Sequence, residues 1–193
     1  MERTGLRAVT FLIAVSVVFW FLRPEVSAVF LMFAAFLIYF YRDPEREIGT
    51  GVTSPADGRI VEASERKIEI FMGIFDCHVN RSPCDGVVEE IEYVSGRFFP
   101  AFLKRSRSNE RNRIWIRSED GVFVVEQIAG VFARRIICYL RVGERVKRGQ
   151  RLGMIVFGSR VTLEIPEGYR FVVGRGDRVK AGQTVAVKDE KAH

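Results

Sequence analysis

The sequence predicts a mainly β domain, a barrel or sandwich, preceded by an N-terminal α-helical hairpin in a membrane. From residue 53 onward, short runs of alternating apolar residues are separated by glycine, which is typical of all-β barrels and sandwiches. Before residue 42 there are instead two long apolar runs. We therefore expect a helical hairpin over residues 1–46 and a β-rich domain over residues 47–193, which is long enough to bury a real core.

The two apolar runs are Ala8–Leu22 and Val26–Tyr41, and neither contains a charged residue. The turn Arg23-Pro24-Glu25 separates them, whereas a secretory signal peptide would supply one run and a small-residue cleavage site. Both runs are shorter than the ~20 residues that span a bilayer comfortably. A full crossing and a re-entrant wedge therefore remain open, and we favour the full crossing.

Basic residues around the hairpin predict its orientation. Arg3 and Arg7 precede the first run, Arg42 and Arg46 follow the second, and only Arg23 lies between them. Under the positive-inside rule, both termini and the β domain lie on the cytoplasmic side of the cell membrane.

The formal net charge of +6 indicates an anionic partner. The sequence resembles no nucleic-acid-binding module, so the surface of an acidic membrane is the expected partner. Three cysteines match neither a disulfide framework nor a zinc spacing, so we expect reduced thiols in a cytosol-facing domain.

The β domain is predicted from nine short runs and from paired turns. Gly143–Gln150 and Gly176–Gln183 are near-copies that resemble the turns of biotinyl/lipoyl-type β-sandwiches, and Pro55–Gly58 and Pro83–Gly86 form a second pair. Internal duplication is the simplest explanation. The expected strands, in chain order, are Arg59–Ala63, Lys67–Met72, Gly86–Tyr93, Arg113–Arg117, Val122–Ile128, Ile136–Leu140, Gly153–Phe157, Val161–Ile165 and Thr184–Val187.

One segment, residues 97–113, mixes large apolar side chains with basic ones and breaks the strand pattern. It is either a solvated loop or, as we prefer for a tethered domain, a flap on anionic headgroups. In the flap, apolar side chains insert and basic side chains bind phosphate; the residues are Phe98, Phe99, Phe102, Leu103, Lys104, Arg105 and Arg107.

Three residues stand out as candidates for chemistry. Ser159 follows Gly158, and a glycine offers the least hindered carbonyl for attack by the next hydroxyl, which would cut the chain. His78 is the one credible imidazole, because His193 ends a charged tail. Asp57 completes the order Asp–His–Ser, in which a carboxylate orients an imidazole that deprotonates a serine. Each residue alone also has an ordinary structural explanation, and no metal-ligand set or nucleotide phosphate loop is visible.

Seven motifs occur in one order across residues 39–187, and with them the chain closely resembles a known family. The motifs are Phe40-Tyr-Arg-Asp-Pro44, Ser54-Pro-Ala-Asp-Gly-Arg59, Asp76-Cys-His-Val-Asn-Arg81, Asn109-Glu-Arg-Asn112, Gln127-Ile-Ala-Gly130, Ala133-Arg-Arg-Ile136 and Gly149-Gln-Arg-Leu-Gly-Met-Ile-Val-Phe-Gly-Ser-Arg160. The family is that of the short-form phosphatidylserine decarboxylase proenzymes, which depend on a pyruvoyl group and include archaetidylserine decarboxylases.

The resemblance implies self-cleavage between Gly158 and Ser159, with Asp57 and His78 activating the serine hydroxyl. The products would be a β chain (1–158) and an α chain (159–193) that starts with a pyruvoyl group made from Ser159. This group would form a Schiff base with the serine headgroup of an anionic membrane phospholipid, and decarboxylation would give the ethanolamine lipid. The resemblance implies no dissociable cofactor, a heterodimer of the two fragments, and at family level a homodimer of these.

Two points stay open at this stage. Longer bacterial members carry a second histidine three residues before the one matched by His78, where this chain has Phe75, so His78 or water would supply the proton after decarboxylation. The lipid backbone is also open between diacyl and ether-linked forms. The sequence has few Asn and Gln residues and many Arg and Glu residues. This composition favours a thermophilic source organism and hence the ether lipid.

Two other functions are compatible with parts of the pattern. A membrane-anchored biotinyl/lipoyl-like carrier or adaptor would share the turn repeat, but it needs a modifiable lysine at an exposed hairpin, and no Met-Lys-Met or Asp-Lys-Ala occurs. A membrane serine hydrolase could use the same three residues without cleavage, although the Gly-x-Ser-x-Gly elbow is missing.

Overall fold

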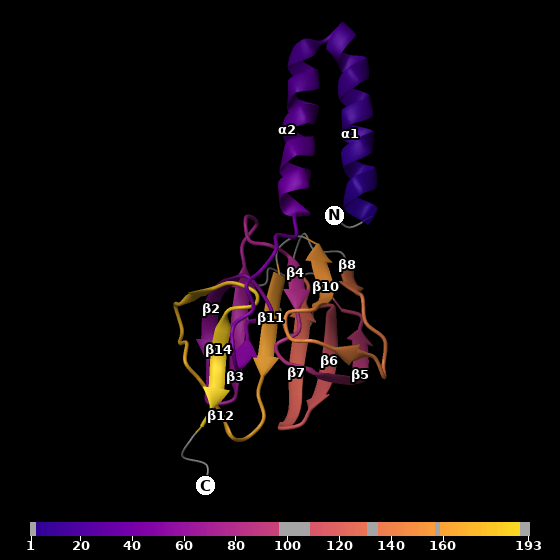
Figure 1. The fold of residues 1–193 in the computed structure, drawn as a ribbon. Helices are drawn as coiled ribbons and strands as arrows, with labels where there is room; N and C mark the ends of the chain where they lie inside the picture. Colours follow the sequence, from indigo (N-terminus) through magenta and orange to yellow (C-terminus); the bar gives the residue numbers. More distant parts are fainter. Residues whose placement is uncertain (1–2, 97–108, 131–134, 157–158, 190–193) are drawn as a thin grey trace. The chain divides into compact units, whose positions relative to one another are not determined.

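The computed structural model describes residues 3–96, 109–130, 135–156 and 159–189, and the predicted mainly β architecture is confirmed (Figure 1). The chain divides into two compact units, Met1–Pro44 and Glu45–His193. The first unit is helical, and the second is built from short strands. The predicted flap residues, Phe98 to Arg107, lie outside the described residues.

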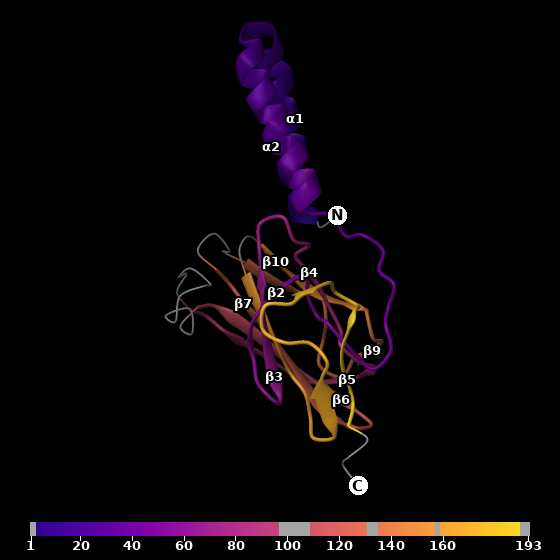
Figure 2. The ribbon, with the colours of Figure 1, turned by 90° about the vertical axis from the view of Figure 1, so that its left-hand side faces the viewer.

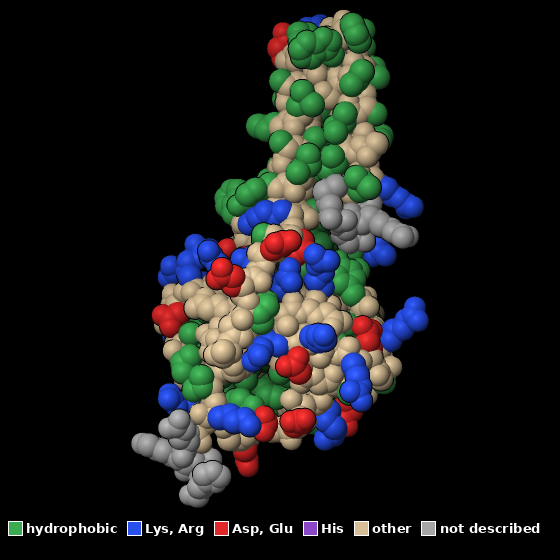
Figure 3. Space-filling view, viewed as in Figure 1, with side chains coloured by type: hydrophobic (Ala, Val, Ile, Leu, Met, Phe, Trp, Pro, Cys, Tyr) green, Lys and Arg blue, Asp and Glu red, His purple; other side chains and the backbone are tan. Residues whose placement is uncertain are grey.

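The first unit consists of α1 (Arg3–Leu22) and α2 (Pro24–Phe40). Pro24 begins α2 because a proline at the first helical position loses no helical hydrogen bond. The two helices pack against each other, and the hydroxyls of Ser16 and Ser27 lie 2.8 Å apart in the buried contact between them. Many apolar side chains are exposed along both helices (Figure 3). Gly5–Leu22 is long and apolar enough to cross a membrane, whereas α2 has 17 residues and is shorter.

The second unit contains the strands of the described chain. They are β1 (Val52–Thr53), β2 (Gly58–Ala63), β3 (Lys67–Met72), β4 (Val79–Arg81), β5 (Gly86–Val94), β6 (Arg111–Ser118), β7 (Gly121–Ile128), β8 (Arg135–Cys138), β9 (Arg145–Val146), β10 (Arg151–Val156), β11 (Ser159–Glu164), β12 (Tyr169–Phe171), β13 (Arg178–Val179) and β14 (Thr184–Lys188).

Eight of these strands form one curled antiparallel sheet in the order β13-β2-β3-β11-β7-β6-β5-β9, seen from its side in Figure 2. Two smaller sheets, β4-β10-β8 and β1-β14-β12, complete the unit. The inner face of the large sheet carries the core, because alternate residues of each strand point to that face. Fully buried examples are Ile68, Ile70, Ile114, Ile116, Val125, Val161 and Leu163.

The two repeated turns are held by matching hydrogen bonds. The backbone N–H of Gly149 donates to the Ser82 carbonyl at 2.8 Å, and Gly182 donates to the Ser54 carbonyl at 3.0 Å. These glycines have φ values of 79° and 91°, a region that favours glycine. Each repeated turn contains a short strand, β9 in the first and β13 in the second. β9 pairs with β5, which begins directly after Asp85, and β13 pairs with β2, which begins directly after Asp57.

Candidate active site

The predicted cleavage position lies where the chain changes sheets. β10 ends at Val156 in the three-stranded sheet, and β11 begins at Ser159 in the eight-stranded sheet, between β3 and β7 (Figure 1). In the β11–β3 ladder, Ser159 stands opposite Met72. Gly158 lies outside the described residues. A break before Ser159 therefore interrupts none of the strand pairings of the described residues in either sheet.

His78 lies in the connection between β3 and β4 and is fully buried. Its Nδ1 is 2.9 Å from the carbonyl oxygen of Asp76. Because a carbonyl can only accept, Nδ1 carries the proton, and the basic nitrogen of the neutral ring is Nε2. The His78 carbonyl in turn accepts the N–H of Ile155 at 3.2 Å, which ties this histidine to the strand that leads to the cleavage position.

Asp57 is also buried, but its hydrogen-bond partners differ from those of a simple triad. One carboxylate oxygen accepts the Arg46 guanidinium at 2.6 Å, and the other accepts the Ala181 backbone N–H at 2.8 Å. Within the part of the chain that the structure describes, Asp57 has no hydrogen bond to His78, whose ring is oriented by the Asp76 carbonyl. The structure thus places Asp57 near the histidine segment, with its carboxylate hydrogen-bonded to Arg46 and Ala181.

Cys77 shows how close the aspartate is to that segment. Burial raises the pKa of the Cys77 thiol; a hydrogen bond from the Val79 backbone lowers it, the Asp57 charge raises it, and the Arg46 charge lowers it. The Asp57–Arg46 pair thus acts electrostatically on Cys77, the residue that directly precedes His78.

A chain of buried amides, not predicted from the sequence, joins the two sheets beside the site. Asn112 Nδ2 donates to Gln127 Oε1 at 2.9 Å, and Gln127 Nε2 donates to Asn80 Oδ1 at 2.8 Å. Asn80 Nδ2 then donates to Met72 Sδ at 3.7 Å. Because a thioether sulfur can only accept, this contact fixes which group of each amide is the donor along the series. All three amides are at most 1% exposed. They couple β4, which follows His78, to the sheet that holds Ser159.

The amides carried a signal in the sequence. Asn80 and Gln127 are polar residues next to or within apolar strand-like runs, and a buried amide without a partner is costly. Arg46, by contrast, gives no local sign of its role, because the partner of its side chain is eleven residues away in a different turn.

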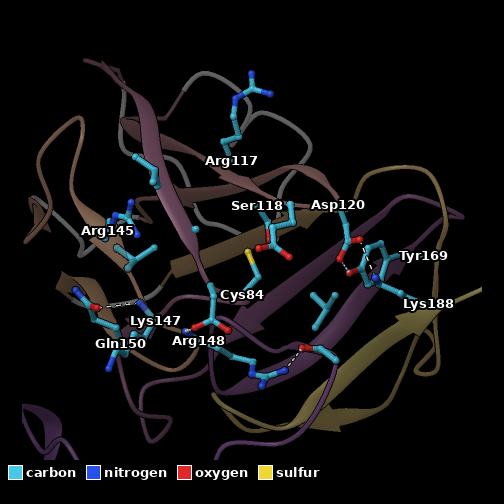
Figure 4. A pocket seen from close by; sticks show the side chains of 17 residues that line it. Cys84, Arg117, Ser118, Asp120, Arg145, Lys147, Arg148, Gln150, Tyr169 and Lys188 are labelled. Atoms are coloured by element: carbon cyan, nitrogen blue, oxygen red, sulfur yellow. Dashed lines mark hydrogen bonds and ion pairs between the residues drawn. The ribbon is translucent and has the colours of Figure 1, made fainter.

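A large cavity lies elsewhere in the second unit. It measures about 980 Å³ and is lined by β9, by the β6–β7 turn and by residues of β12 and β14 (Figure 4). Neither His78 nor Asp57 lines it. One acidic residue of its lining, Asp120, accepts Lys188 Nζ at 2.7 Å and the Tyr169 hydroxyl at 2.8 Å.

Comparison with known proteins identifies the family. Residues 33–187 match the family described as phosphatidylserine decarboxylase. The chain belongs to the phosphatidylserine decarboxylase family. The matched range contains His78, Asp57 and Ser159, and it ends before the charged C-terminal tail. Membership makes the chain a decarboxylase, a carboxy-lyase, and favours neither the carrier nor the serine hydrolase.

Relatives from archaea and bacteria match most of the chain. A protein of Archaeoglobus fulgidus, provisionally named archaetidylserine decarboxylase proenzyme, is 53% identical and covers 98% of this chain and 97% of its own length. The phosphatidylserine decarboxylase proenzyme of Solidesulfovibrio magneticus is 40% identical over 97% of this chain and 95% of its own. That of Nitrosomonas eutropha is 46% identical over 79% of this chain and 77% of its own. The predicted family resemblance is therefore confirmed.

Proposed function

We propose that this chain is a membrane-tethered proenzyme that cuts itself between Gly158 and Ser159 and then decarboxylates the serine headgroup of a phospholipid. The observation that carries the proposal is the place of Ser159 as the first residue of β11, directly after the chain has crossed between sheets. Cleavage there leaves the new end anchored in a central strand. The proenzyme names of the relatives support the same reading.

His78 is proposed as the base for cleavage. Its Nε2 takes the proton of the Ser159 hydroxyl, whose oxygen bonds to the Gly158 carbonyl carbon while the Gly158–Ser159 C–N bond breaks and the nitrogen gains a proton. The resulting ester then loses the Ser159 α-proton and its Cβ–O bond, which releases fragment 1–158 as a carboxylate. Water adds to the dehydroalanine that remains, and loss of ammonia leaves a pyruvoyl end on fragment 159–193.

The surroundings of Ser159 suit such an end group. The pairing with Met72 holds the residue in the sheet, and buried His78 lies in the connection that directly follows β3. A ketone at this position supplies the electron sink for decarboxylation. His78 would hold and return the proton at Nε2, while Asp57 supplies a fixed negative charge near the histidine segment.

We further propose that the two fragments stay together as a heterodimer. Fragment 159–193 contributes β11 between β3 and β7, β13 on β2, and β14 on β1. Each of these contacts is a strand pairing with fragment 1–158, so separation would break all of them. A homodimer of such heterodimers is the further assembly that we propose.

The apolar helices and the basic residues around them support a hairpin in the cell membrane with the β domain in the cytoplasm. The substrate is then an anionic serine phospholipid of the same membrane, and the flap side chains, Phe98 to Arg107, are proposed to contact it. The name of the A. fulgidus relative favours the ether-linked archaetidyl form.

The test follows the chain on a denaturing gel and by mass spectrometry. Wild type is expected to give two fragments, with the smaller one lighter by one ammonia than the same peptide with N-terminal serine. Ser159→Ala and His78→Ala should remain intact and release no carbon dioxide from archaetidylserine or phosphatidylserine vesicles. An active enzyme that is a single unbroken chain would refute the proposal.

A further inference from the structure

The two aspartates of the repeated turns provide an internal comparison. Asp57 accepts the backbone N–H of Ala181 at 2.8 Å, and Asp85, at the matching position, accepts the backbone N–H of Arg148 at 3.0 Å. The serines that begin the two motifs also match: Ser54 Oγ donates to the Ala56 carbonyl and Ser82 Oγ to the Cys84 carbonyl, both at 2.7 Å. The backbone of the two copies is therefore nearly equivalent.

The side chains around the two aspartates are not equivalent. Asp57 is covered by Arg46, and the two side chains are 11% and 14% exposed. Asp85 is exposed on the rim of the 980 Å³ cavity, and no cation bonds to its carboxylate among the described side chains. One copy thus has a buried ion pair, and the other has a solvated carboxylate.

The difference comes from residues 46–51, the connecting segment that leads into β1. Its Gly49 N–H donates to the Gly182 carbonyl at 2.9 Å, and its Thr50 carbonyl accepts the Thr184 hydroxyl at 2.7 Å. Ile48 packs against both matching glycines: a Cβ atom on Gly149 would clash with its Cδ1, and one on Gly182 would lie 2.9 Å away. The segment therefore lies across both repeats.

The connecting segment crosses both repeats in one direction, so it makes different contacts with each copy. At one end Arg46 reaches Asp57, and at the other the Gly51 carbonyl accepts Arg148 Nη1 at 2.7 Å. A buried carboxylate needs a partner, whereas the exposed Asp85 is hydrated. The asymmetry gives one copy a carboxylate of fixed position. The turn that carries it, Pro55–Gly58, is joined to the strand after His78, because the Arg81 backbone N–H donates to the Pro55 carbonyl at 2.9 Å.

We infer that Arg46 is a positioning residue for self-cleavage: it fixes the Asp57 carboxylate, and with it the Cys77–His78 segment, for attack at Ser159. This inference rests on the proposed function. Arg46 acts through Asp57 and does not touch the reacting atoms. Its planar guanidinium suits this task, because it holds a carboxylate in a defined geometry better than an ammonium does.

The experiment measures the rate at which full-length precursor, made by cell-free synthesis with detergent or vesicles, is converted into its two fragments. Arg46→Met is expected to slow conversion at least about tenfold, the size typical of a lost positioning contact. Arg46→Lys keeps the charge but not the fork, and should recover part of the rate. Asp85→Asn and Arg148→Met alter the matching copy and should cleave at the wild-type rate.

Stability is controlled separately, because an unpaired buried Asp57 also weakens the fold. All rates are measured well below the melting temperature of each variant. In Arg46→Met/Asp57→Asn the unpaired charge is gone, so stability should return while cleavage stays slow. If this double variant, or Arg46→Met itself, cleaves as fast as Arg148→Met, the inference is wrong. If Ser159→Ala still yields two fragments, the proposed function fails instead.

Discussion

Replacing Gln127 by Met tests whether the buried amide chain holds the two sheets together. Met keeps the length of the side chain but removes both the donor to Asn80 and the acceptor for Asn112. One buried acceptor and one buried donor are then left without partners, and each costs about 1–3 kcal/mol. Gain of apolar surface offsets part of this cost. We expect the free energy of unfolding to fall by about 2–4 kcal/mol.

The assay is equilibrium urea unfolding in detergent, followed by circular dichroism of the β structure. It is made in the Ser159→Ala background so that every molecule is one chain. The interaction is isolated with a double-mutant cycle: Asn80→Ala and Gln127→Met together should cost less than the sum of the single changes, by about 1 kcal/mol or more. A Gln127→Met variant within about 0.5 kcal/mol of its parent would behave like a surface change and refute the reasoning.

Two further predictions concern packing and burial. Gly153→Ala should prevent stable folding, because the new Cβ would clash with the Ile137 carbonyl and lie 3.2 Å from Gln127 Nε2. Gly174→Ala should fold normally, because its Cβ would meet no described atom within 4 Å. Soluble yield in detergent and the melting temperature compare the two variants. Burial raises the pKa of Cys84 from 9.0 to about 12, so the folded protein keeps this proton longer than the unfolded chain does. The stability that this burial contributes is therefore complete below pH 9.0 and is lost as the pH rises towards 12. Iodoacetamide at pH 8 should modify the more exposed Cys138 before Cys84; equal rates by mass spectrometry would contradict the burial argument.

Longer strands could be predicted from the sequence because their alternation is a local property. β3 has the predicted bounds Lys67–Met72, and its alternate residues are buried against the core. β9 and β13 have only two residues each, too few to show alternation, and they exist because they pair with β5 and β2 far away in the chain. Their turns were nevertheless visible as a repeated motif.

The candidate site divides in a similar way. His78 could be proposed from the sequence because the chain has only two histidines, and Ser159 could be proposed because it follows a glycine. The partners of Asp57 could not, since Arg46 and Ala181 reach it through tertiary contacts that no local pattern encodes. In the sequence Arg46 counted only as one of the positive charges next to the apolar helices.

The interleaving of early and late strands sets an order for the proposed self-cleavage. Ser159 pairs with Met72 on one side, β11 pairs with β7 on the other, and β14 pairs with β1 near the start of the domain. If cleavage needs this assembled sheet, as the proposed function implies, scission follows the pairing of strands from both ends of the domain. The keto group would then arise only in a domain already assembled around it.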